Sequence, residues 1–156
     1  MKKFELTAES KINIFGKKLF RIKALISFGD VEAGETGGWV EKEGNVNQSG
    51  NAWVSGDAMV SGNAEVYGNA KVHGDAMVYG DAEVSGDADY TTIHGFGTQF
   101  RTTTFFRCKD KKVRVACGCF FGTIPEFREQ VKNTRKGKIA EEYLMIADLM
   151  EKHFEK

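Results

Sequence analysis

The side chains best suited to hold a small charged molecule lie between Gly95 and Arg107. The tract begins G-F-G-T-Q-F-R-T-T-T, which combines glycine-rich backbone, hydroxyls, aromatic rings and a guanidinium. Backbone N–H groups and arginine suit phosphate oxygens, and aromatic rings suit nucleotide bases. The tract therefore predicts a nucleotide site, and the alternative is a loop with an ordinary hairpin of solvated basic residues. The predicted ligand-binding residues are Thr98, Gln99, Phe100, Arg101, Thr103 and Arg107.

Histidine and cysteine give a weaker case for catalysis or metal binding. His73 is the only histidine in the repeated part of the chain, and His94 and His153 are not paired with it. Cys117 and Cys119 lack a second cysteine pair at a zinc spacing, so we expect reduced thiols buried in the core. We expect no catalytic residue, no metal site and no cofactor.

A six-residue repeat from Gly50 to Asp87 must position any such site. Each hexad reads V-x-G-[ND]-A-x, in which Val suits a buried strand and Gly-Asx suits a corner. Hexads of this kind are typical of a parallel β-helix. A turn of 18 residues would stack Val54 under Val72 and Tyr90, Val60 under Val78, and Val66 under Val84.

The residues that flank these valines would point outward. Met59, Met77 and Tyr79 make the most apolar of the three faces. An exposed apolar patch on a small protein usually marks an interface. We therefore expect a homodimer or homotrimer that uses this face, and a ligand or partner site is the alternative.

Three parts of the chain are predicted. Residues 1–43 form an N-terminal β cap, residues 44–90 the repeat, and residues 91–156 a β-hairpin and helical region. Lys42 and Gln48 stand where Val is expected, so the first turn of the repeat is imperfect.

The C-terminal part contains strand and helix signals. The composition of residues 102–107 and 112–117 predicts two strands of a hairpin. Thr123 and Glu126 form a capping-box pattern with Pro125 between them, which predicts a helix start. Apolar residues from Ile139 to Met150 mark a second helix.

The formal charge of the 156 residues is zero, which gives no overall pull toward DNA or a membrane. The charge is uneven, however. Residues 41–90 contain nine acidic and two basic side chains, and residues 91–156 contain thirteen basic and eight acidic ones. With no long apolar run and no export signal, we expect a cytoplasmic protein of a bacterial host.

The chain resembles small hexapeptide-repeat proteins of phages and prophages, a family described as polymer-forming or acyltransferase-like. The matching stretches include Gly37-Gly38-Trp39-Val40-Glu41, the G-N-A-x-V repeats and Cys117-Gly118-Cys119-Phe120. The resemblance implies a mainly β fold, namely a short left-handed parallel β-helix with an N-terminal β cap, a C-terminal β-hairpin and two helices.

For function, the residues and the resemblance together favour a non-enzymatic phage-type binding protein. It would inhibit host defence by sequestering a small nucleotide signal. One alternative is a hexapeptide-repeat acyltransferase that uses coenzyme A with His73 as general base. The other is a protein-directed inhibitor or a structural and assembly module.

Overall fold

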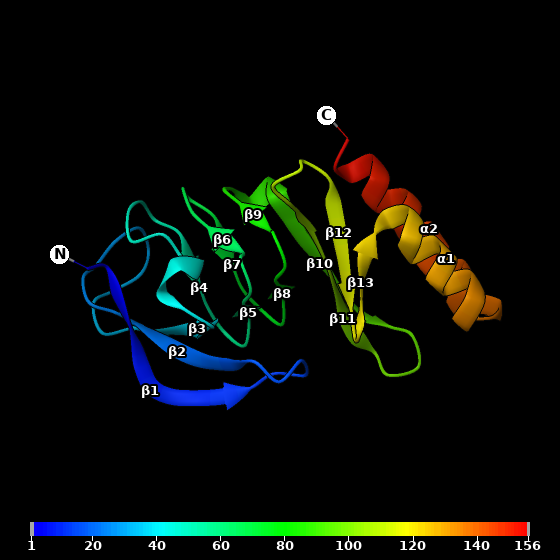
Figure 1. Cartoon of the computed structure of the whole chain (residues 1–156). Coiled ribbons are helices and arrows are strands. Elements are labelled where there is room, and N and C mark those ends of the chain that lie inside the picture. Colours follow the sequence, from blue (N-terminus) through cyan, green and yellow to red (C-terminus); the bar gives the residue numbers. More distant parts are fainter. Residues whose placement is uncertain (1, 156) are drawn as a thin grey trace.

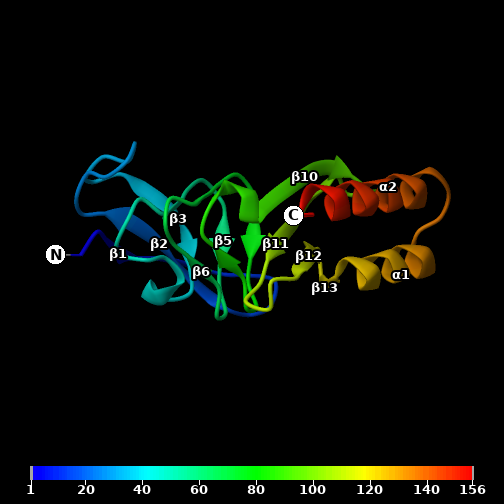
Figure 2. The ribbon, with the colours of Figure 1, turned by 90° about the horizontal axis from the view of Figure 1, so that it is seen from above.

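The computed structural model describes residues 2–155. The chain starts at one end of an elongated molecule and finishes at the other (Figure 1). An antiparallel hairpin lies at the N-terminal end and the hexads lie in the middle. A four-stranded sheet and two helices lie at the far end (Figure 2). The order of the parts in space therefore follows their order in the sequence.

The N-terminal part contains three antiparallel strands. They are β1 (Phe4–Ile12), β2 (Lys18–Ala24) and β3 (Thr36–Val40). Asn13 fixes the turn between the first two, because its Oδ1 accepts hydrogen bonds from the amides of Phe15 and Lys17 at 2.9 and 3.0 Å.

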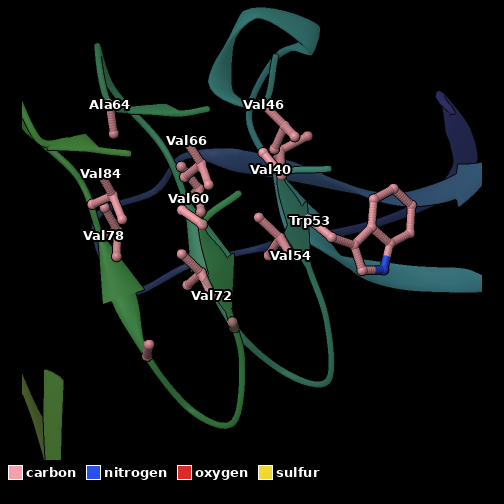
Figure 3. Close-up of a cluster of buried hydrophobic side chains, with 14 of the residues drawn as sticks. Val40, Val46, Trp53, Val54, Val60, Ala64, Val66, Val72, Val78 and Val84 are labelled. Atoms are coloured by element: carbon pink, nitrogen blue, oxygen red, sulfur yellow. The ribbon is translucent and has the colours of Figure 1, made fainter. Parts of the chain in front are cut away.

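The hexads provide short strands that pair in parallel. They are β4 (Trp53–Val54), β5 (Met59–Val60), β6 (Glu65–Val66), β7 (Lys71–Val72), β8 (Met77–Val78) and β9 (Glu83–Val84). Each of the first three pairs with the strand 18 residues later. The predicted pairs are confirmed for Val54 with Val72, Val60 with Val78, and Val66 with Val84. These valines point into one shared core, where all are fully buried (Figure 3).

The predicted fold class, a left-handed parallel β-helix, is nevertheless wrong. The strands of the hexads are only two residues long, and they are divided among three separate sheets. The pair β5–β8 continues the N-terminal strands in a sheet of order β1-β2-β3-β5-β8. The pairs β4–β7 and β6–β9 each form a separate two-stranded sheet. None of the sheets described for residues 2–155 is closed. The protein is a mixed, β-rich molecule with several separate sheets and two helices.

Two features accompany the division of the hexad strands into separate sheets, namely the glycine corners and the segment that precedes the hexads. Each strand ends at its valine, two residues before a glycine corner. At one such corner Gly68 has a φ of +62°, and a Cβ there would lie 2.8 Å from the carbonyl oxygen of Ser85. The segment before the hexads also pairs with them at a different residue spacing. Val40 pairs with Val60, a separation of 20 residues instead of 18, which agrees with the predicted imperfect start of the repeat.

Tyr90 also departs from the prediction that it stacks on Val72. It begins an antiparallel strand opposite Phe106, and its hydroxyl donates to the carbonyl of Lys71 at 2.7 Å. The 18-residue pairing of the hexads therefore stops before Tyr90.

The hydrogen bonds between successive layers of hexads all have the same direction, because the amides of one layer donate to the carbonyls of the next layer toward the C-terminus. For example, the amide of Trp53 donates to the carbonyl of Ala70 at 3.0 Å. In the first layer of hexads, backbone amides of Trp39, Glu41 and Asn47 donate to some of the carbonyls, and the other carbonyls must be satisfied if they are buried.

Two side chains supply donors to those carbonyls. The Lys3 ammonium donates to Ala52 O at 2.7 Å and to Gly50 O at 3.3 Å. Asn45, at the end of the 3₁₀ helix η1 (Glu43–Asn45), donates to Ala64 O at 2.9 Å. Lys3 and Asn45 thus close the N-terminal edge of the hexads.

The last row has the opposite need, because its amides lack acceptors. The hydroxyl of Thr104 accepts from the amide of Met77 at 3.0 Å. The carboxylate of Asp89, in the 3₁₀ helix η2 (Asp87–Asp89), accepts from the amide of Ser85 at 2.9 Å. Side chains therefore cap both ends of the hexads, which limits strand addition by another chain.

The C-terminal part contains a four-stranded antiparallel sheet and two helices. The elements are β10 (Tyr90–Phe96), β11 (Arg101–Arg107), β12 (Val113–Cys117), β13 (Phe120–Thr123), α1 (Ile124–Thr134) and α2 (Gly137–His153). The strands predicted over 102–107 and 112–117 agree with β11 and β12 to within one residue. The predicted capping box is confirmed, since Thr123 and Glu126 exchange hydrogen bonds at 2.8 and 3.2 Å.

The sheet is buried on both faces, between the hexads and the helices. Phe106 belongs to the core of the hexads, whereas Phe105 belongs to the core that includes Phe127 and Tyr143. Strand alternation sends neighbouring residues of β11 to opposite faces. The helices consequently cover one face of the sheet only, and they leave a pocket at one end.

Candidate functional site

The predicted ligand-binding residues lie at different places along β11. Arg101 begins this strand and Arg107 ends it, a distance of about 20 Å for an extended chain. The Nε of Arg107 donates to Asp89 at 3.2 Å, and its guanidinium lies 5.4 Å from the Phe154 ring centre. Arg107 therefore lies at the opposite end of the strand from Arg101, and it lines a different pocket.

Thr103 is also unable to contact a ligand. Its side chain is buried, and its hydroxyl donates to the Cys117 sulfur at 3.2 Å. Strand alternation places this residue under the helices.

The other predicted residues lie at the β10–β11 connection, which is exposed. Thr98 and Gln99 are exposed there, and Phe100 is 66% exposed with a φ of 51°. Gln99 Oε1 accepts a hydrogen bond from Arg101 Nη2 at 2.6 Å. Gln99 and Arg101 are therefore brought together, and Phe100 is available to stack on a flat molecule beside them.

Arg101 opens onto a pocket of about 190 Å³ between the sheet and the two helices. Its walls come from β11, the β12–β13 turn, the end of α1 and the middle of α2. The lining residues are Arg101, Cys117, Cys119, Phe120, Phe127, Gln130, Val131, Thr134, Arg135 and Tyr143. Two of these residues are arginines and none is acidic, so the pocket favours an anion.

Arg101 is placed by the turn that follows β12. Its guanidinium lies directly against Gly118, where a Cβ would overlap with the Nη1 atom. Gly118 also has a φ of +59°, which favours glycine. The glycine between the two cysteines is thus required both by the turn and by the position of Arg101.

Arg135 faces the pocket from the end of α1. Its backbone N–H donates to the carbonyl of Val131 at 2.8 Å and so ends the helix. Its guanidinium lies 5.9 Å from the centre of the Tyr143 ring. Arginine in this arrangement keeps N–H donors free for an anion while it packs on an aromatic face.

Tyr143 is the unusual polar group of the pocket. Its side chain is 2% exposed, and its hydroxyl has no hydrogen-bond partner among the described residues. Burial raises the pKa of this hydroxyl and the nearby Cys117 raises it further, whereas the charges of Arg135 and Arg101 lower it. A buried hydroxyl without a partner is unfavourable. Its oxygen has almost no exposed surface and lies against Gly97, where a Cβ would be only 2.6 Å away.

The cysteines differ from the expectation of buried core thiols. Cys108 and Cys117 are buried, but Cys119 is exposed, and all three are free. Cys119 is exposed because it lies in the turn between β12 and β13, whereas Cys117 is the last residue of β12.

The predicted oligomer face is not a free surface throughout. Met59 and Met77 are partly buried. The ring of Tyr79 packs within the chain, 4.9 Å from Phe121 and 5.1 Å from Phe15 between ring centres. Burial raises the pKa of Tyr79 to about 12. Tyr79 therefore contributes to internal packing.

The three histidines occupy separate surroundings. His73 packs edge-on against Tyr90, and His153 packs against Phe154. His94 Nδ1 lies 2.7 Å from the hydroxyl of Thr102. Within residues 2–155, no three His, Cys, Asp or Glu side chains are grouped so that they could hold a metal ion.

The sequence pattern predicted Arg101 as a site residue but indicated neither Arg135 nor Tyr143, which line the same pocket. Arg135 follows a helix and reads as a solvated end residue, and Tyr143 fits the apolar stripe of its helix. No local signal separates either from an ordinary helix residue, because the pocket forms only when distant segments pack.

A comparison with protein-family models found no match, and a comparison with curated proteins also found none. The resemblance to hexapeptide-repeat proteins thus stays a prediction. No helix of residues 2–155 combines the length and the apolar character that crossing a membrane requires. The described residues form a small β-rich protein with a pocket that two arginines and no acidic side chain line.

Proposed function

We propose that this protein binds a small phosphorylated ligand of the nucleotide class and does not turn it over. The observation that carries the proposal is a pocket that Arg101 and Arg135 line and that contains no acidic side chain. Guanidinium groups bind phosphate through paired, charge-assisted hydrogen bonds. The two guanidinium groups together offer enough N–H donors for the oxygens of one phosphate group.

The size of the pocket limits how such a ligand binds. A volume of about 190 Å³ is below the roughly 300–1,000 Å³ of pockets that enclose drug-sized molecules. The phosphate would occupy the pocket, and the nucleoside would lie outside it. The exposed ring of Phe100 is next to Arg101 in the chain and offers a surface for base stacking.

Binding without turnover would lower the free concentration of the ligand. In this proposal the protein acts in the cytoplasm of a bacterial host and holds a nucleotide signal of host defence.

Isothermal titration of the full chain with adenosine monophosphate and with inorganic phosphate tests the proposal. We expect Arg101→Gln or Arg135→Gln to weaken binding by about 10- to 100-fold, since each removes a charged hydrogen bond worth roughly 1.5–3 kcal/mol. Arg128→Gln is the matched control, because Arg128 lies on the same helix as the pocket wall and pairs with Asp148 and Glu151.

Mass spectrometry of the ligand after incubation tests the absence of turnover. We expect an unchanged nucleotide to be recovered. If neither phosphate nor the nucleotide binds at millimolar concentration, or if the ligand is recovered as a product, the proposed function is wrong.

A further inference from the structure

Cys119 is the thiol of this chain that is open to chemistry. It lies in the two-residue turn Gly118–Cys119 and is exposed. Cys117 is buried, and its sulfur accepts a hydrogen bond from the Thr103 hydroxyl. Cys108 is also buried, and burial raises its pKa to about 11. A reagent in solution therefore meets Cys119 first.

This thiol shares its pocket with two positive charges. The Arg101 guanidinium lies against Gly118, the residue between the two cysteines, and Arg135 forms another wall. The ring of Tyr143 lines the same pocket and lies 5.9 Å from the Arg135 guanidinium. A recess lined by one sign of charge raises the local concentration of the opposite charge.

We propose that Cys119 is a modification site for small anionic disulfides, and that its modification closes the anion pocket. The inference rests on the proposed function, because the adduct and the phosphorylated ligand would use the same arginines. The chemical class is a disulfide with carboxylates, such as oxidised glutathione. Its carboxylates pair with the guanidinium groups and bring the sulfur to the thiol.

The exchange reaction is balanced without another reactant. The Cys119 thiol gives its proton to solvent, and the thiolate attacks one sulfur of the disulfide. A bond forms between the Cys119 sulfur and that sulfur while the original disulfide bond breaks. The other half leaves as a thiolate and takes up a proton. Cys119 is oxidised, the leaving half is reduced, and excess thiol reverses the step.

The adduct excludes the ligand for two reasons. It fills a pocket of only about 190 Å³, and its carboxylates occupy Arg101 and Arg135. Oxidising conditions would then release the ligand and reducing conditions would restore binding.

The test compares two reagents on the full-length protein. The first is dianionic dithiobis-nitrobenzoate and the second is neutral dithiodipyridine, and each rate is divided by the rate of free cysteine with the same reagent. We expect the fast-reacting thiol to prefer the anionic reagent by about tenfold or more. Added salt should reduce this preference.

Variants assign the preference to residues. Cys119→Ser should remove the fast-reacting thiol, and Arg101→Gln should reduce the preference by about fivefold or more. Arg128→Gln, with the same loss of charge outside the pocket, should leave it unchanged. Arg135→Gln replaces Arg101→Gln if the latter fails to fold by circular dichroism.

Several results would overturn the inference. These are a fast thiol that persists in Cys119→Ser, a preference that Arg101→Gln and Arg135→Gln do not change, or nucleotide binding that continues after full modification. The proposed function is judged separately from binding by unmodified Cys119→Ser. If that variant binds no nucleotide but the wild type shows charge-selective modification, the function fails and the modification site stands.

Discussion

Lys3 provides the sharpest test of how the hexads are closed. Its side chain is 1% exposed, and its ammonium donates to the carbonyls of Ala52 and Gly50. Burial lowers the pKa of Lys3 from 10.5 to about 8. The folded protein therefore gives up this proton at a lower pH than the unfolded chain.

The sign of the pH dependence follows from that difference. Below pH 8 both states are protonated, and the folded state carries the unfavourable buried charge. Between about pH 8 and 10.5 the unfolded chain keeps a proton that the folded state has lost, so stability rises with pH. At 1.36 kcal/mol for each pKa unit, the gain by pH 9.5 is about 2 kcal/mol.

The assay is urea unfolding of the wild type and Lys3→Met at several pH values from 7 to 9.5. Methionine cannot donate to the two carbonyls, so we expect Lys3→Met to be less stable. The difference should widen by about 2 kcal/mol over this range, because only the wild type gains stability with pH. Taking the difference between the two proteins cancels the titration of other groups.

Lys2→Met is the matched control. Lys2 is exposed and pairs only at the surface with Glu43, at 3.1 Å. Its removal should change stability by less than about 1 kcal/mol at every pH. A difference between Lys3→Met and the wild type that stays constant from pH 7 to 9.5 would refute the reasoning on Lys3.

Three further predictions concern the pocket and its supporting helix. Gly118→Ala should weaken phosphate binding in calorimetry by about tenfold, because its Cβ would displace the Arg101 guanidinium. Gly137→Ala is the control and should leave phosphate binding unchanged, because Gly137 has a similar φ of +61° but no atom within 4 Å of its Cβ position. Tyr143→Phe should leave the melting temperature unchanged or raised, since it removes a buried hydroxyl without a partner, and a marked fall would mean that the hydroxyl is bonded. Thr123→Ala should cost about 1 kcal/mol in urea unfolding through loss of the helix cap, and no change would contradict the capping role.

The sequence predicted the pairing within the hexads because their period alone determines it. A strict spacing brings Val54 beside Val72 whatever surrounds them. The predicted fold class was wrong because of the segment before the hexads. There Val40 pairs with Val60, which links the N-terminal hairpin to only one of the three sheets that contain hexad strands. That linkage depends on packing between distant segments, which a local period does not report.

The candidate site was predicted in part for a similar reason. Arg101 was found because its neighbours have suitable chemistry. Thr103 and Arg107 were assigned with it because they are near in sequence, but a strand alternates its faces and separates its ends. Arg135 and Tyr143 reach the pocket only through the packing of the two helices on the sheet.

The capped rows also make the middle of this molecule a spacer whose length can change in fixed steps. An insertion of three hexads would add one layer of strands and move the C-terminal sheet away from the N-terminal hairpin by about 4.8 Å. Lys3 and Asn45 would still meet carbonyls at one end, and Thr104 and Asp89 would still meet amides at the other. The distance between the hairpin and the anion pocket can therefore be altered without redesign of either end.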